Sequence, residues 1–385
     1  MIAYNKQWLA NLAARRQAED VFDEGCIEKE ELEAVYKKFP VGFYSPNVFI
    51  GMGLLLLTIL ILFFSFGLLA LMFESSSERT FGLLAFFFAV ISYTVLEFMA
   101  RVKNHYSSGV DEGLLWMASI AVFSGSLLLF DNGPLANSAI IFVISLYGSL
   151  RYADRLMATL LYGSFIAILF YSCIEMGDAG KTIVPFLVMA ASLISYMLVH
   201  AAKAKQLFIN YKNCLTMIEI TSLVSLYAAG NYFVVRELSN EMFHLNLAAA
   251  SSIPFGWLFW IFSAIIPVIY ILRGIQQKDA ILIRVGLLLI AAIVFTVRYY
   301  YMLLPLETIM TIAGVLILAT AYTLVKWLHE PVHGFTSRLI SSKNETGKLQ
   351  VESLIIAQTF KPGTDIPGSK FGGGSFGGGG ASGDY

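Results

Sequence analysis

Residues 281–327 read ILIRVGLLLIAAIVFTVRYYYMLLPLETIMTIAGVLILATAYTLVKW, two long apolar runs joined at the segment MLLPL, residues 302–306. Each run is close to the roughly 20 residues that an α-helix needs to cross a bilayer. The pattern therefore predicts a hairpin of two membrane-spanning helices. Arg284, Arg298 and Glu307 lie within it, and they are informative because a charge inside a span is costly.

The composition of the whole chain indicates the same class of protein. Of its 385 residues, 57% are hydrophobic and 14% are charged, whereas a soluble domain carries about 25% charged residues. We therefore expect an all-α, polytopic membrane helix bundle with the lipid bilayer as its main partner. The charges are few and scattered through loops, and their sum of -1 carries no message about acidic partners, so no nucleic-acid partner is expected.

Apolar runs recur along the chain and predict ten spans. They lie at Phe49–Phe73, Thr80–Ala100, Leu114–Phe130, Leu135–Leu150, Leu156–Met176, Ile183–Ala202, Cys214–Val235, Pro254–Leu272, Ala280–Leu303 and Leu306–Trp327. The third and fourth are short, so a count of eight with a re-entrant pair stays open. Helix is expected for all of them, because hydrocarbon offers no hydrogen-bond partner to free amide groups.

The distribution of basic residues predicts the orientation of these spans, because Lys and Arg are retained in cytoplasmic loops. Loops after even-numbered spans hold Arg101, Lys103, Arg151, Arg155, Lys203, Lys205, Lys212, Arg273 and Lys278. Loops after odd-numbered spans hold Arg79, Lys181 and Arg236. We expect a multi-pass protein of the inner (plasma) membrane with both termini in the cytoplasm.

The segments outside the predicted bundle, 49–327, differ in character. Residues 1–45 predict a cytoplasmic hairpin of two amphipathic helices that docks on the bundle or on a partner. Residues 328–360 form a cytoplasmic juxtamembrane segment. Residues 361–385 are rich in Gly and Phe and predict a disordered tail, because such a sequence buries too little apolar surface to order itself.

Depth along the spans suggests which intramembrane charges could meet. At a rise of roughly 1.5 Å per residue, Glu219 and Arg284 lie within one or two turns of the same cytoplasmic surface and could pair. Glu97 lies four residues before Arg101, so the two can meet on one helix face without a distant partner. Near the outer surface, Arg298 and Glu307 could pair across the 281–327 hairpin.

These charges support two interpretations. The first is structural, with ion pairs joining helices and basic side chains reaching the headgroups. The second is a substrate or proton pathway, in which Glu219 is a carrier carboxylate poised by Arg284 in a cytoplasm-facing cavity. A closed bundle favours the first interpretation, and a water-filled cavity reaching Glu219 favours the second.

One literal motif concerns metal chemistry. Residues 329–333, HEPVH, match HExxH, which presents two His ligands to zinc from one helix face. Pro331 disfavours a continuous helix there, so His329 and His333 are only a weak candidate metal pair. No cofactor and no catalytic residue are predicted.

The stretch DEGCIEKEE at residues 23–31, followed by Phe39-Pro40 and a multi-span bundle, resembles a family of bacterial predicted membrane proteins of unknown function. The segments VRYYY at 297–301 and LPLE at 304–307 are similar to those of such proteins from Bacteroidetes-like bacteria. The resemblance implies an inner-membrane address and no activity.

The leading functional hypothesis is a non-enzymatic envelope scaffold that binds a protein partner through its cytoplasmic ends. The alternative is a secondary transporter that uses Glu219 with Arg284 and Arg298 with Glu307. A membrane-embedded enzyme is the third hypothesis.

Overall fold

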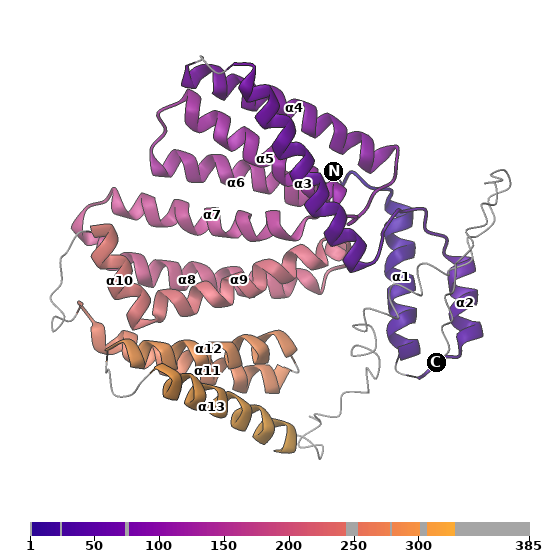
Figure 1. Ribbon diagram of the computed structural model, residues 1–385. Helices are drawn as coiled ribbons and strands as arrows, with labels where there is room; N and C mark the ends of the chain where they lie inside the picture. Colours follow the sequence, from indigo (N-terminus) through magenta and orange to yellow (C-terminus); the bar gives the residue numbers. More distant parts are fainter. Residues whose placement is uncertain are drawn as a thin grey trace, which may run out of the picture. The chain divides into compact units, whose positions relative to one another are not determined.

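The computed structural model describes residues 2–23, 25–73, 77–243, 253–277, 279–300 and 306–327, and this part of the chain is all-α (Figure 1). In chain order the elements are α1 (Lys6–Asp23), α2 (Lys29–Lys38), α3 (Val48–Leu71), α4 (Glu78–Arg101), α5 (Val110–Leu129), α6 (Pro134–Tyr152), α7 (Arg155–Ile174), α8 (Asp178–Lys203), the 3-10 helix η1 (Gln206–Tyr211), α9 (Lys212–Gly230), α10 (Tyr232–Phe243), α11 (Gly256–Gln277), α12 (Ala280–Tyr300) and α13 (Leu306–Trp327).

Eight of these helices are long and apolar enough to cross a membrane: α3 to α8, α11 and α12. A ninth span results if α9 and α10 count as one bent span. The tenth predicted span coincides with α13, and its crossing stays a prediction. The third and fourth spans were predicted too short, because α5 has Asp111 and Glu112 in its first turn and α6 has Arg151 in its last turn. Both α5 and α6 are long enough to cross, which disfavours a re-entrant pair there.

The seventh span is broken, contrary to the single helix predicted over Cys214–Val235. The axes of α9 and α10 differ by 75° at Asn231. The Asn231 side chain is buried and its Oδ1 accepts hydrogen bonds from the backbone N–H groups of Phe233 and Val234, at 3.0 and 3.2 Å. Its Nδ2 donates to Thr296 Oγ1 at 3.1 Å. An asparagine that caps a new helix favours a break at this position.

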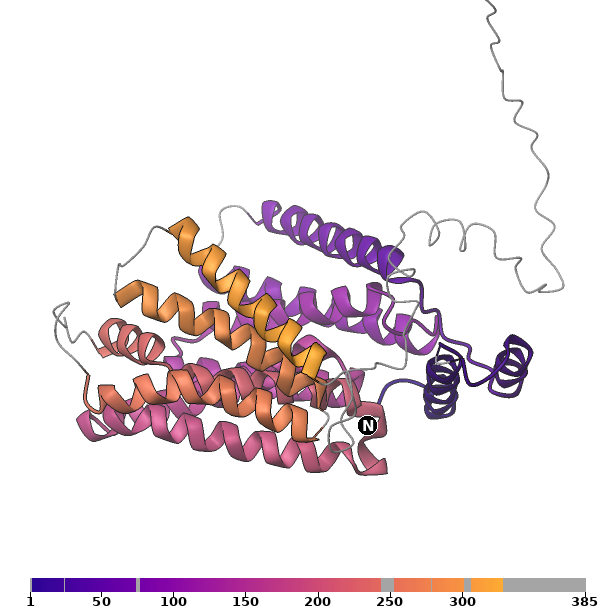
Figure 2. The same ribbon diagram turned by 90° about the horizontal axis from the view of Figure 1, so that it is seen from below.

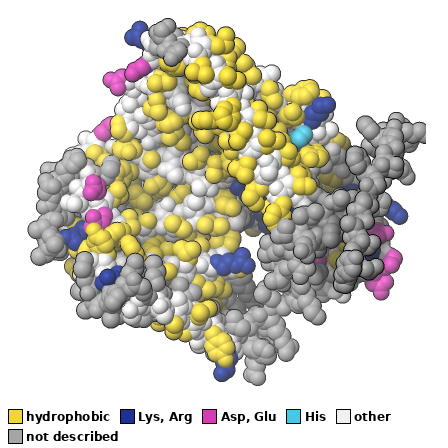
Figure 3. All heavy atoms as spheres, viewed as in Figure 1, with side chains coloured by type: hydrophobic (Ala, Val, Ile, Leu, Met, Phe, Trp, Pro, Cys, Tyr) yellow, Lys and Arg dark blue, Asp and Glu magenta, His cyan; other side chains and the backbone are white. Residues whose placement is uncertain are grey.

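Consecutive helices pack as pairs: α4 with α5, α6 with α7, α8 with α9 and α11 with α12. Helix α9 connects three of these pairs, since it contacts α7, α8, α11 and α12, and the α4–α5 pair joins the next pair through contacts between α5 and α6 (Figures 1 and 2). The exposed side chains of the spanning helices are largely hydrophobic (Figure 3). Such a surface implies contact with a lipid bilayer.

Helix α3 packs on α5 at the edge of the bundle, and a glycine allows the two backbones to approach closely. Gly109 has a φ of +87°, and a Cβ atom there would lie 2.0 Å from the carbonyl oxygen of Gly51. Both the positive φ and the close approach therefore require glycine. No residue in the most apolar stretch of α3 is buried.

Both helices predicted in residues 1–45 are present as α1 and α2. In α2 the side chain of Glu28 and that of Glu31 form a capping box, which satisfies amide groups at the helix start. Arg15 joins the two helices, because its guanidinium donates to the carbonyl oxygens of Phe39 and Tyr36 at 2.6 and 2.8 Å. The two helices lie at one end of the spanning bundle (Figure 2).

Candidate functional site

Glu97 on α4 is the centre of an ion-pair cluster that joins α4 to α6. Its carboxylate accepts from Arg151 Nε and a terminal guanidinium nitrogen, at 2.8 and 2.9 Å. The hydroxyls of Tyr152 and Tyr93 also donate to it, at 2.6 and 2.9 Å. Arg101 binds from one turn along α4 at 2.7 Å. A carboxylate with this many charge-assisted donors is well satisfied within a bundle.

The Glu97–Arg101 contact was predicted from spacing, but the expectation that Glu97 needs no distant partner was wrong. Arg151 is as shielded as the carboxylate it binds, with each side chain 19% exposed. Arg101 is 57% exposed. The distant arginine is therefore the one that crosses between helices.

Glu219 on α9 is the most buried carboxylate among the described residues with an ion-pair partner, at 1% exposure. Lys203, the last residue of α8, contacts its Oε2 through the ammonium group. His200, one turn earlier on α8, places Nδ1 3.3 Å from Oε1. Asp279, which precedes α12, lies beside them, and one ligand atom each of His200, Glu219 and Asp279 lies within 4.8 Å of the others.

The contacts of the described residues do not include the predicted pair of Glu219 with Arg284. Arg284 lies on α12, which packs on α9, but its side chain is exposed. Depth arguments do not fix the rotation of a helix about its axis. Lys203 and His200 satisfy the carboxylate from α8 instead.

The remaining predicted residues fall at or beyond the edge of the described part. Arg298 is half-buried on α12. Glu307 lies in α13, but its side chain is outside the described residues, so the Arg298–Glu307 pair stays a prediction. His329 and His333 also lie outside the described residues.

A second group of polar residues, missed by sequence reasoning, docks the N-terminal segment on the bundle. Asp111 at the start of α5 is buried and accepts from the Tyr4 hydroxyl at 3.0 Å and from the backbone N–H groups of Ser107 and Ser108, both at 2.9 Å. The amide of Ala3 donates to the carbonyl of Arg151 at 2.8 Å. These bonds attach the residues before α1 directly to the spanning helices.

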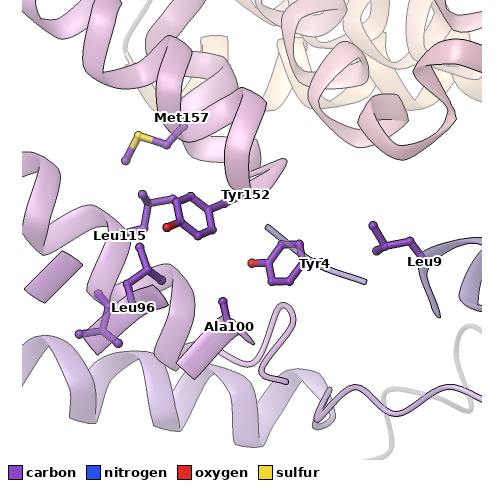
Figure 4. Close-up of a cluster of buried hydrophobic side chains, with 8 residues drawn as sticks. Tyr4, Leu9, Leu96, Ala100, Leu115, Tyr152 and Met157 are labelled. Carbon is purple, nitrogen blue, oxygen red and sulfur yellow. The ribbon is translucent and has the colours of Figure 1, made fainter. Parts of the chain in front are cut away.

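Aromatic and aliphatic packing surrounds this contact. The ring of Tyr4 meets that of Tyr106 edge-on at 4.9 Å, and Phe43 stacks on Tyr106 at 5.0 Å. Figure 4 shows Tyr4 facing Tyr152 and the neighbouring aliphatic side chains of the bundle. Burial, followed by the Asp111 carboxylate, raises the pKa of Tyr4 well above its usual range. The hydroxyl therefore remains a donor.

Asp154, between α6 and α7, lies in the same region. Its Oδ1 accepts from the backbone N–H of Met157 at 2.7 Å and from Trp116 Nε1 at 3.3 Å, so it caps α7. Burial raises the pKa of this carboxyl, and the nearby charge of Asp111 raises it further. The sequence signal for Asp154, an acidic residue directly before an apolar run, is that of a helix cap.

A groove of about 340 Å³ runs between α1 and the start of α9, beside this docking contact. Leu9, Leu12 and Ala13 of α1 form its apolar floor, the exposed Ile209 adds a further apolar side chain, and the exposed charged residues Arg16, Asp20 and Lys212 lie at its rim. The groove therefore combines an apolar floor with charges of both signs.

The hollows that we describe within the spanning part have a different character. One of about 380 Å³ lies between α7, α8, α9 and α10 and is lined by residues such as Ile166, Phe170, Val188 and Val235. Another of about 230 Å³ lies between α5, α6 and α7 and includes Trp116 and Met157. Glu219 lines neither of them.

No family model, no curated protein and no solved structure matches this chain. The fold and the apolar spans define the class: it is a multi-pass, all-α membrane protein.

Proposed function

We propose that this protein is a non-enzymatic scaffold of the bacterial inner membrane that binds a protein partner at its cytoplasmic face. The single observation that carries the proposal is the attachment of the α1–α2 hairpin to the bundle through Tyr4 and Asp111. A hairpin held by buried hydrogen bonds presents the groove beside α1 in a fixed position. Preformed surfaces of this kind bind with little ordering cost.

The groove suits a short amphipathic segment of a partner. Leu12 and Ala13 on its floor are half-buried, so a partner's apolar side chains could complete their burial. Arg16, Asp20 and Lys212 at the rim would orient flanking charges. Apolar centres with polar rims are typical of protein interfaces, and helix-in-groove binding uses this arrangement.

The state of Glu219 favours the scaffold over the transporter. A carrier carboxylate must face a cavity through which its substrate crosses the membrane, whereas Glu219 is almost fully buried, is paired with Lys203 and lines neither hollow described among the spans. Glu97 is neutralised in the same way by two arginines. Ion pairs of this kind join helices without providing a pathway, and the hollows described among the spans are lined largely by apolar side chains.

A photo-cross-linker placed at Gln17, on the groove rim, tests the proposal in native membranes. We expect one discrete adduct, and we expect the Ala13→Trp substitution, which fills the floor, to abolish it. Ala34→Trp is the matched control, since Ala34 is exposed on α2 away from the groove lining. The partner should copurify in equal amount with the Ala34→Trp variant and not with the Ala13→Trp variant.

Two results would contradict the proposal. The first is an adduct whose yield does not change when the groove is filled, provided that both variants unfold at the same temperature. The second is solute uptake by vesicles containing the purified chain that is lost in Glu219→Gln.

A further inference from the structure

Three side chains with metal-binding groups meet where α8, α9 and α12 come together. His200 comes from the last turn of α8, Glu219 from the second turn of α9, and Asp279 from the residue before α12. Their ligand atoms lie within 4.8 Å of one another. Because these residues are spread over 80 positions of the chain, their meeting is a product of the fold and not of a local motif.

The geometry is near that of a bound ion. Bonds from zinc to imidazole nitrogen and carboxylate oxygen are about 2.0–2.2 Å, which places ligand atoms about 3–4 Å apart around one ion. His200 Nδ1 and Glu219 Oε1 are already 3.3 Å apart. Only a small inward movement of Asp279 is therefore needed to complete a three-ligand site.

The surroundings provide both shielding and access. The Glu219 carboxylate is buried, while the His200 side chain is 51% exposed. Because His200 lies in the last turn of α8, the site is at one end of this spanning helix, and an ion approaching that end would meet His200 first. Asp279 Oδ1 accepts from the backbone N–H of Ile281 at 2.8 Å, which keeps the carboxyl group near the start of α12, a small shift away from the other two ligands.

Lys203 is the positive charge that an ion at this site would have to compete with. Its ammonium group contacts Glu219 Oε2, on the opposite oxygen from the one that faces His200. The chain therefore already supplies one positive charge to this cluster. Two carboxylates against one ammonium leave net negative charge when His200 is neutral, which favours an additional cation.

We propose that His200, Glu219 and Asp279 bind one divalent first-row transition-metal ion such as Zn²⁺, and that Lys203 is the competing cation. One imidazole and two carboxylates suit Zn²⁺ or Mn²⁺ better than Ca²⁺, which takes six to eight oxygen ligands. The ion would fasten the α8–α9 pair to the α11–α12 pair. This inference goes beyond the proposed function and does not depend on it.

Zinc binding by the purified full chain in detergent tests the inference, with Zn²⁺ content after equilibrium dialysis and titration calorimetry as readouts. We expect one Zn²⁺ per chain, and a loss of affinity of more than about tenfold in His200→Ala and Asp279→Asn, since even outer-shell changes cost 10–100-fold. Asn can still cap α12, so the second variant should fold. Removal of the competing charge in Lys203→Met should tighten binding by about tenfold or more.

Two controls make the result decisive. His105→Ala removes a histidine of the α4–α5 loop that bonds Ser108, and it should bind Zn²⁺ like the unaltered chain. The double variant His329→Ala, His333→Ala should also bind normally. Binding that survives in His200→Ala, that is lost in the 329/333 variant, or that is absent from the unaltered chain at millimolar Zn²⁺ would overturn the inference.

Discussion

Replacing Arg151 by methionine should destabilise the protein far more than the same replacement of Arg101, although both arginines bind Glu97. Breaking a fully buried ion pair costs about 3–5 kcal/mol, whereas an exposed pair is worth about 0.2–1 kcal/mol. Glu97 and Arg151 are each one-fifth exposed and share two hydrogen bonds. We therefore expect a loss of about 2–3 kcal/mol for Arg151→Met, between these limits.

Arg101 is more than half exposed, so Arg101→Met should cost less than about 1 kcal/mol. Methionine keeps a long apolar side chain in both variants, which matches them for packing. The free energy of unfolding can be measured for both in mixed micelles by titration with a denaturing detergent. A difference between the two variants below about 0.5 kcal/mol, the usual error of additivity, would refute the assignment of Arg151 as the main partner of Glu97.

Three further predictions concern other parts of the fold. Asn231→Ala should lower the free energy of unfolding by about 1–2 kcal/mol, because it removes the cap of α10 and the hydrogen bond to Thr296. Amide hydrogen exchange should become faster in residues 232–243 and not elsewhere. Unchanged exchange in these residues would contradict the capping role. Gly109→Ala should lower the free energy of unfolding by about 2 kcal/mol or more, because its Cβ would meet the Gly51 carbonyl. The control Gly53→Ala, with open space around it, should not destabilise the protein. Equal unfolding temperatures for the two variants would count against the close approach of α3 and α5. Because the pKa of Asp154 is raised in the folded protein, the stability that its protonated form contributes is present below the usual pKa of 3.8 and is lost as the pH rises through the raised value. The free energy of unfolding, measured relative to that of Asp154→Asn, should therefore fall with rising pH above 3.8. A difference between the two proteins that does not change with pH would contradict this prediction.

Local signals were sufficient for much of the fold. Apolar length alone located α3, α4, α7, α8, α11 and α12, because hydropathy is a property of contiguous residues. The i,i+4 spacing of Glu97 and Arg101 was also sufficient to predict their ion pair. The break at Asn231 also had a local signal, since Gly-Asn typically ends a helix. Because Gly230-Asn231 lies inside an apolar run, the whole run was predicted as one span.

Contacts between helices could not be read from the sequence. Residue position gives the depth of Glu219 and Arg284, but the direction in which each side chain points depends on how the helices pack, and Arg284 is exposed. Lys203 was placed in the loop after the sixth predicted span, and His200 fell inside that span with no predicted partner. The meeting of Tyr4 with Asp111 joins residues 107 positions apart, and neither residue belongs to a recognisable motif.

The most direct test of the account is the side of the membrane on which the α1–α2 hairpin lies, because the proposed groove joins α1 to the α8–α9 junction near Lys203. Cys26, in the turn between α1 and α2, is exposed, whereas Cys173 and Cys214 are buried. A membrane-impermeant maleimide applied to bacterial cells carrying the chain should leave Cys26 unlabelled in intact cells and label it in inside-out vesicles. Labelling of Cys26 in intact cells would place the hairpin outside and contradict the account.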